Sequence, residues 1–286
     1  MLTMSSFIEQ NEMDLANEKL KMCMDEIKSW MDRNFLKLNT DKTTIQVFMP
    51  GSLKKNPKLA FSFNDGETVI KASGMAKILG VTLDKDMNFS EFATKKVQVC
   101  NMHLRNLRNI KESLSQKVKA LLVSQLILST LDYCNALLIC VPNYIIKRLQ
   151  VTMNNSIRFI FGLKRRDHIS EYLFKLHILP MEYRVRFKVS LIAHKIVNGF
   201  APEYLSEIFK TYTPSTTINL RANCGRDSLM LDSCFGHPPL FENLVSEWNS
   251  LPYFIRATIP TVDFKKHLKT FYFKKAFPQF IDAVVC

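Results

Sequence analysis

The sequence SQKVKALLVSQLILSTLDYCNALL (Ser115–Leu138) lies near the middle of a chain of 286 residues. From Leu121 to Val141 it is apolar enough to be tested as a membrane span. Asp132 and two neighbouring amides would be costly in lipid, so we favour a helix buried in a protein core. Ser115 is a good N-terminal cap, and we expect one long helix from there to Leu138.

Helical periodicity continues on both sides of this segment. Apolar residues recur at spacings of three and four from Ser90 to Leu107, and again from Pro142 to Gly162, where a glycine is typical of a helix end. Residues 211–238 are rich in Thr, Ser, Asn and Gly and are expected to form a loop. Further helices are predicted at Ser170–Leu176, Met181–Val197, Pro202–Phe209, Pro239–Trp248 and Thr261–Lys275.

The first 88 residues have a different pattern. An amphipathic helix is expected from Met13 to near Asn34. After it, alternating apolar residues predict short strands around residues 45–49, 59–63 and 69–70, with a turn at Asn64-Asp65-Gly66. Ile78–Leu83 is expected to be one more strand. The fold class predicted is therefore mainly α, with a short N-terminal α/β part made of one helix and a small antiparallel sheet.

The charge balance is strongly basic, with 39 Lys and Arg against 26 Asp and Glu. Residues 147–195 alone hold eleven Lys and Arg and three acids. Cations with interleaved aromatic residues suit phosphate and base contacts, although such charges can also be solvated helix faces. The candidate nucleic-acid contacts in this tract are Lys164, Arg165, Arg166, Arg184, Arg186 and Lys188.

Other chemistry is poorly supported. The seven cysteines include no C-x-x-C pair, so we expect reduced thiols in an intracellular protein, nuclear or cytoplasmic, and we find no signal peptide. Cys224, Cys234 and His237 do not have the spacing of a compact zinc site, and no metal ligands are assigned. Asp132 in its apolar helix is expected to have a structural role, paired with an arginine or accepting a hydrogen bond inside the fold, rather than to act in catalysis. No hydrolase triad or phosphate-binding loop is present.

Eight segments follow one another along the chain: WMDRNFLKLNTDKT, LGVTLD, LDYCNALL, LQVTMNNSIRFIF, LHILPMEYRVRFK, NGFAPEYL, WNSLPYFIR and FKKHLKTFYF. In this order they resemble the C-terminal part of the reverse transcriptase of non-LTR retrotransposons (LINEs) of the jockey-like group. The resemblance covers residues from about Lys19 to Phe277.

The resemblance implies three parts: the end of a polymerase palm at 1–88, a helical thumb at 89–162, and a helical C-terminal region at 163–286. Lys42 would match the palm lysine near the phosphates of the incoming nucleotide. Leu79, Gly80 and Val81 would match the hairpin that grips the primer. The implied partners are RNA and DNA, as an RNA–DNA hybrid, while the oligomeric state is left open.

The chain departs from the family in its acidic residues. Polymerases of this kind use Mg²⁺ ions held by aspartates, including an adjacent pair, and this sequence contains no Asp-Asp. We therefore expect no catalytic residues and no cofactor in this chain, which is interpreted as a truncated, inactive polymerase that still holds nucleic acid. The alternatives are a polymerase subunit complemented by a separate palm polypeptide, or a helical scaffold with no nucleic-acid role.

Overall fold

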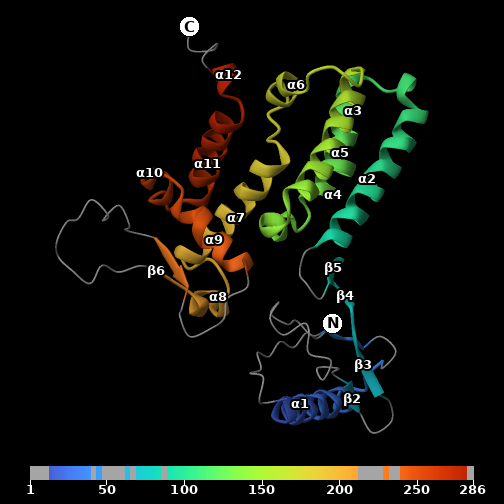
Figure 1. The fold of residues 1–286 in the computed structure, drawn as a ribbon, viewed down its shortest axis with the longest axis vertical. Coiled ribbons are helices and arrows are strands. Elements are labelled where there is room, and N and C mark those ends of the chain that lie inside the picture. The colour runs from blue at the N-terminus through green and yellow to red at the C-terminus, as the bar shows by residue number, and fades with distance from the viewer. Residues whose placement is uncertain are drawn as a thin grey trace, which may run out of the picture. The chain divides into compact units, whose positions relative to one another are not determined.

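The structure, a computed structural model, describes residues 13–39, 43–46, 62–64, 69–84, 89–211, 228–231 and 239–281. It is mostly helical with small sheets, which confirms the predicted fold class (Figure 1). The chain forms two compact units, Met1–Met87 and Asn88–Cys286. The second unit contains both segments that the resemblance assigns to a thumb and a C-terminal region.

The first unit begins with α1 (Met13–Arg33) and continues with a three-stranded sheet in the order β1-β3-β2. Strand β3 (Val69–Ser73) is central. It pairs antiparallel with β2 (Ser62–Asn64) and parallel with β1 (Ile45–Gln46), so the sheet is not purely antiparallel as expected. The expected turn residues 65 and 66 lie outside the described residues.

A hairpin replaces the single strand expected at Ile78–Leu83. Strands β4 (Met75–Ile78) and β5 (Val81–Asp84) pair antiparallel, with Ile78 opposite Val81. Leu79 and Gly80 form the two-residue turn with φ of 47° and 83°. Positive φ at both positions is the type I′ geometry that fits the twist of hairpin strands, and it explains the glycine.

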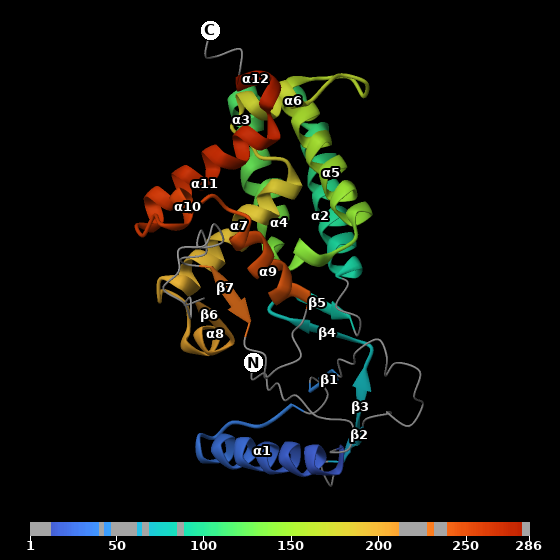
Figure 2. The same ribbon diagram turned by 60° about the vertical axis from the view of Figure 1, so that its left-hand side comes forward.

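The second unit opens with a layer of three helical segments. Helices α2 (Ser90–Asn109) and α5 (Asn143–Phe161) lie side by side and run in the same direction, since Arg148 near the start of α5 donates to Thr94 near the start of α2 at 3.3 Å (Figures 1 and 2). Between them in sequence lie the short 3₁₀ helix Lys111–Ser113 and α3 (Gln116–Leu122). The Ser115 side chain accepts from the Val118 amide at 3.4 Å, which confirms the predicted cap.

The long helix predicted to reach Leu138 is shorter than expected. After α3 the chain forms a π-helical turn (Val123–Leu128) and then α4 (Ser129–Asp132). Tyr133 is extended and Cys134 has φ of 50°, so the helix ends there, and residues Asn135–Cys140 form a separate 3₁₀ helix. Across the described ranges, no helix combines the length and the apolar character needed to cross a bilayer.

Helix α7 (Met181–Val197) lies among the remaining elements and contacts α5, α8, α9, α11 and the 3₁₀ helix Asn135–Cys140. It ends close to the predicted Asn198-Gly199, where Gly199 has φ of 70°. The other elements are α6 (Ser170–Lys175), α8 (Glu203–Ile208), α9 (Pro239–Asn249), α10 (Tyr253–Arg256), α11 (Thr261–Ala276) and α12 (Pro278–Ile281).

A short sheet interrupts the loop expected at 211–238. Strand β7 (Leu229–Leu231) pairs antiparallel with β6 (Phe209–Thr211). The Asn249 side chain completes the pairing of β7, because its amide both accepts from and donates to the Leu229 backbone at 3.0 Å. This contact joins the end of α9 to the strand.

Candidate nucleic-acid interface

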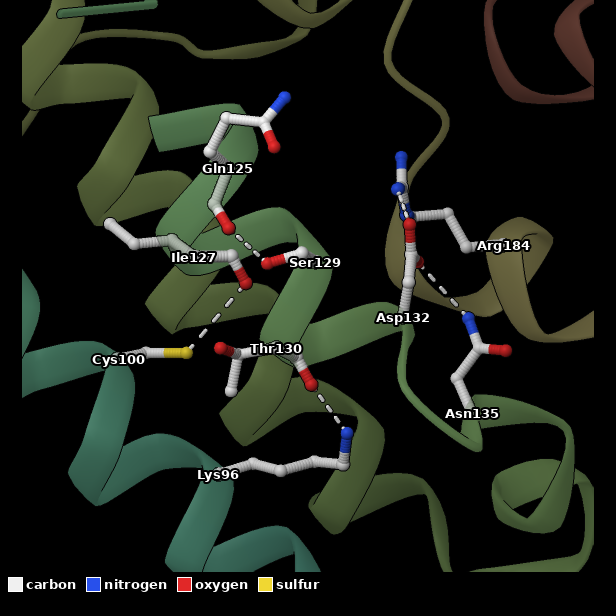
Figure 3. Close-up of polar contacts among 9 residues, drawn as sticks. All are labelled: Lys96, Cys100, Gln125, Ile127, Ser129, Thr130, Asp132, Asn135 and Arg184. Atoms are coloured by element: carbon white, nitrogen blue, oxygen red, sulfur yellow. Dashed lines mark hydrogen bonds and ion pairs between the residues drawn. The ribbon is translucent and has the colours of Figure 1, made fainter. Parts of the chain in front are cut away.

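The end of α4 carries an internal ion pair (Figure 3). Arg184 of α7 donates through Nε to Asp132 Oδ1 at 2.8 Å, and its Nη2 also contacts Asp132 Oδ2. Asn135 donates to the same carboxylate at 3.2 Å. Asp132 therefore has a structural role, as expected, in the form of an arginine pair that joins the corner after α4 to α7.

Lys96 of α2 lies at the other side of this corner and is only 5% exposed. Its Nζ donates to the backbone oxygen of Thr130 at 2.5 Å (Figure 3). It also donates to the backbone oxygen of Tyr133 at 2.6 Å and lies 4.7 Å from the centre of the Phe92 ring. The lysine thus satisfies carbonyls that the helix end leaves open. Burial lowers the pKa of Lys96 to about 8.

The thiol of Cys100 belongs to the same polar cluster. It donates to the Ile127 carbonyl, inside the π-helical turn, over 3.8 Å (Figure 3). Burial raises the pKa of Cys100 to about 11, so the thiol stays protonated at neutral pH. Lys96 and Cys100 therefore stabilise the π-helical turn and the end of α4, and Cys100 is not an activated nucleophile.

A second buried network joins three helices. Tyr272 of α11 donates to Glu247 Oε1 of α9 at 2.6 Å, and Ser190 of α7 lies 2.9 Å from the tyrosine oxygen. Because a carboxylate only accepts, Ser190 must donate to Tyr272. Arg186 of α7 reaches the other oxygen of Glu247 at 3.1 Å, and also Glu182 at 2.9 Å. Burial and the Glu247 charge together raise the pKa of Tyr272.

His194 of α7 is fully buried and stacks on Phe264, with ring centres 4.0 Å apart. Its Nε2 donates to the Thr258 carbonyl at 2.9 Å, which fixes the tautomer because a carbonyl only accepts. Burial lowers the pKa of His194, so the ring is neutral. This histidine packs α7 against the segment between α10 and α11.

Two of the candidate phosphate contacts need correction. Arg184 and Arg186 were expected to bind nucleic acid, but Arg184 pairs with Asp132, and Arg186 pairs with the buried Glu247 and the exposed Glu182. If such an arginine turned to a phosphate, the carboxylate that it pairs with would be left in a partly buried site without a compensating charge. We therefore assign both residues to the packing of α7.

This assignment makes a prediction about stability. Arg184→Met is expected to lower the free energy of unfolding by about 1–3 kcal/mol, because the Asp132 carboxylate loses its charged donor. Asp132→Asn added to Arg184→Met is expected to cost less than the two single changes together. Urea unfolding followed by circular dichroism measures both values. Arg166→Met, at an exposed arginine, is the control and should change stability by less than about 0.5 kcal/mol.

The three cations after α5 are placed differently. Gly162 closes the helix with φ of 67°, and Lys164, Arg165 and Arg166 then follow in a turn. The Lys164 amide donates to Asp167 Oδ2 at 2.7 Å, which fixes the turn, while all three cationic side chains are exposed. None of them forms an ion pair with another residue that the structure describes.

The two aromatic residues at the end of α5, Phe159 and Phe161, are not free to stack on bases. Phe159 is buried, and Phe161 is half-buried against Tyr172, with ring centres 4.6 Å apart. Beneath the Lys164–Arg166 turn these rings therefore support the fold. The chemistry that the turn offers is positive charge directed into solvent.

Lys188 is half-buried on α7 and, with Lys195, flanks a shallow pocket of ≈ 210 Å³. Ile192 and the Cys134–Ala136 segment also line it. Ligand pockets for small molecules usually enclose about 300–1,000 Å³. The pocket is smaller than that range, so Lys188 stays a candidate only for a surface phosphate contact.

The remaining candidates lie in the first unit or outside the description. Leu79 and Gly80 form an exposed hairpin turn, whereas Val81 is buried, so only the tip of this hairpin is accessible. Lys42 and the zinc alternative at Cys224, Cys234 and His237 lie outside the described residues. Lys96 and Glu247 were missed, because an isolated charge in a helix has the sequence pattern of a solvent-facing residue.

The part of the chain that the structure describes does not fit a magnesium site. It contains no group of three or more His, Cys, Asp or Glu side chains close enough to hold a metal ion. The carboxylates of Asp132 and Glu247 both face arginines instead.

Three comparisons of the chain with known proteins gave no match. The chain matches no protein-family model, no curated protein and no solved structure.

Proposed function

We propose that this chain is the nucleic-acid-holding C-terminal part of a reverse transcriptase of the LINE type, and that it binds the backbone of an RNA–DNA hybrid. The observation that carries the proposal is the turn Lys164–Arg166, where three consecutive cationic side chains are exposed and none forms an ion pair with a residue that the structure describes. Cations of this kind neutralise phosphates and release counterions.

Two further features support the proposal. The order of the fold, a small sheet followed by a helical unit from Asn88, agrees with a palm end followed by a thumb. The hairpin turn Leu79–Gly80 occurs where the resemblance implies a primer grip, and its glycine allows close approach of a strand. The proposed substrates imply a protein of the nucleus or cytoplasm.

The proposed role is binding without synthesis. The sequence has no adjacent aspartates, and the described carboxylates do not fit a pair of metal ions. Purified chain given a primed RNA template, Mg²⁺ and dNTPs is expected to incorporate no nucleotide. Incorporation by the purified chain would contradict this part of the proposal and favour a polymerase subunit.

Binding is tested with the triple substitution Lys164→Gln, Arg165→Gln, Arg166→Gln, called the turn variant. We expect the affinity for a labelled 20-base-pair RNA–DNA hybrid at 100 mM salt to fall roughly tenfold or more. The slope of log K against log salt should become shallower by about 2, because up to three phosphate contacts are lost. Fluorescence anisotropy over a salt series measures both quantities.

A matched control removes the same charge elsewhere. Lys265, Lys266 and Lys269 are exposed on α11, and their change to Gln, called the α11 control, should alter affinity by less than about twofold if charge alone is not enough. Equal losses in the turn variant and the α11 control would argue against a specific site. Absence of binding by the unchanged chain at low salt would favour the scaffold alternative.

A further inference from the structure

Several helix ends of the second unit meet at one end of the α2–α5 layer. Because α2 and α5 run in the same direction, both helices end there. Helix α3 begins at the same place, because the Lys119 ammonium lies 5.8 Å from the centre of the Phe159 ring near the end of α5. The Lys164–Arg166 turn leaves from the same place. Figures 1 and 2 show these ends together from two directions.

This end of the unit is strongly basic. Residues 103–120 and 158–169 hold nine Lys and Arg against two acids. One acid, Asp167, accepts from a backbone amide, and the other, Glu112, contacts its neighbour Lys111 at 3.3 Å. We name the following set the basic end: Arg105, Arg108, Lys111, Lys117, Lys119, Arg158, Lys164, Arg165 and Arg166.

Helix electrostatics explain only part of this charge. Arg108 and Arg158 lie in the last turns of α2 and α5, where cations are favoured by the helix dipole. Lys117 lies in the first turn of α3, which has no acidic residue and where a cation is disfavoured by roughly 0.3–1 kcal/mol. The exposed Arg105 and Lys117 have no ion pair with a described residue, so their charge is not used within the fold.

We infer that the basic end is a docking surface for the sugar-phosphate backbone of double-stranded nucleic acid. The inference rests on the proposed function and extends it from the turn Lys164–Arg166 to the ends of α2 and α3. Five of the nine cations are arginines, which bind phosphate oxygens in a fixed two-pronged geometry. A polyanion supplies the charge that this surface lacks.

The aromatic residues favour a duplex over a single strand. Binding of unpaired bases relies on exposed aromatic rings, worth about 1–3 kcal/mol for each stacked base. At this end Phe159 is buried, while Phe161 and Tyr172 pack on one another. Ile110, Val118 and Leu121 are exposed here, but aliphatic side chains are poor stacking partners for bases. The surface therefore fits paired strands, which present phosphates and hide their bases.

The test uses the triple substitution Arg105→Gln, Arg108→Gln, Lys117→Gln, called the helix-end variant, which leaves the Lys164–Arg166 turn unchanged. In the full chain we expect its affinity for the 20-base-pair RNA–DNA hybrid to fall roughly tenfold, with a salt slope shallower by about 2. The unchanged chain should bind the hybrid more tightly than single-stranded RNA of equal length. The α11 control should remain within twofold of the unchanged chain.

Folding is checked by circular dichroism, and a second variant guards against a local structural effect. Arg105→Lys with Arg108→Lys keeps the charge, so it should retain most of the salt slope while a damaged fold would not. If the helix-end variant binds the hybrid like the unchanged chain while the turn variant does not, the inference is wrong and the proposed function stands. If the unchanged chain binds no nucleic acid, both the inference and the proposed function are wrong.

Two other outcomes would overturn the inference. Tighter binding of single-stranded RNA than of the hybrid would contradict the duplex preference. Exposed aliphatic residues beside cations can also suit an anionic membrane surface. The same variants are therefore tested on vesicles containing 30% phosphatidylserine, and a loss of vesicle binding with unchanged hybrid binding would assign the basic end to lipid.

Discussion

Glu247→Ala is expected to lower the free energy of unfolding of the second unit by about 3–5 kcal/mol. Its side chain is 8% exposed and accepts from Tyr272 at 2.6 Å and Arg186 at 3.1 Å. Without the carboxylate, the tyrosine hydroxyl loses its acceptor in a buried site, and the arginine loses its buried partner. Removal of the side chain also leaves a void between α7, α9 and α11.

Trp248 reports this unfolding directly. The chain has two tryptophans, and Trp248 is fully buried in the second unit, whereas Trp30 is half exposed on α1. A Trp30→Phe background therefore leaves one fluorescent reporter of the second unit. Urea titrations in this background, with circular dichroism as a second probe because Glu247 and Trp248 are adjacent, give the change in stability.

Glu182→Ala is the matched control, since Glu182 contacts the same arginine from the surface. Its side chain is 58% exposed, so its removal should change stability by less than about 0.5 kcal/mol. Tyr272→Phe combined with Glu247→Ala should be milder than the sum of the single changes, by about 1–3 kcal/mol. Equal changes in the free energy of unfolding for Glu247→Ala and Glu182→Ala would show that the buried network stabilises the fold no more than a surface ion pair.

Local signals in the sequence were enough for the helices that pack by one face. In α5, Ile145, Leu149, Met153 and Ile157 recur at helical spacing and are fully buried, and Gly162 ends the helix in the left-handed conformation. The period of the apolar residues and the backbone freedom of glycine are both readable within one segment. The mainly helical fold class followed from several segments of this kind.

The errors arose where distant residues decide the backbone. The helix expected to reach Leu138 ends at Asp132, and the carbonyls at its end are taken by Lys96, 37 residues before Tyr133 in the sequence. At Leu79–Gly80 the apolar pattern predicted a single strand, because the turn of the hairpin begins with leucine, where asparagine or glycine is usual, and only the family resemblance implied a hairpin there. In both places the local pattern favoured a longer regular element.

The same distinction separates the candidate site residues. Arg184 and Arg186 are held by Asp132 and Glu247, which lie 52 and 61 residues away in the sequence, so no local pattern could show that they are occupied. The exposure of Lys164–Arg166 was foreseeable, because three adjacent cations after a helix-ending glycine cannot all face a core. The grouping of Arg105 and Lys117 with them depends on the parallel packing of α2 and α5.

Lys96 is expected to make the second unit more stable as the pH rises from about 8 toward 10. The folded protein holds this amine with a pKa of about 8, below the ordinary 10.5, because burial disfavours the charged form. Below pH 8 the amine is protonated in both states and contributes no pH dependence. Between pH 8 and 10.5 the unfolded chain binds a proton that the folded protein has released, so rising pH favours folding.

The size of this effect follows from the two pKa values. Linkage predicts a gain of about 2 kcal/mol in the free energy of unfolding between pH 7.5 and pH 10 from this one group. Other lysines, tyrosines and thiols also ionise in this range, so the quantity to compare is the difference between the unchanged chain and Lys96→Met. Methionine keeps an unbranched apolar side chain at this position and removes the titrating group.

Lys95→Met provides the control for this comparison, because Lys95 is the neighbouring residue and its side chain is exposed, in contact with Glu91 at 3.5 Å. Urea unfolding of Trp248 in the Trp30→Phe background at pH 7.5, 8.5, 9.3 and 10 should show that the Lys95→Met chain gains stability in parallel with the unchanged chain. Lys96→Met should lack about 2 kcal/mol of that gain. Parallel curves for all three chains would mean that the ammonium stays charged beside the Thr130 and Tyr133 carbonyls, so that these two acceptors outweigh burial.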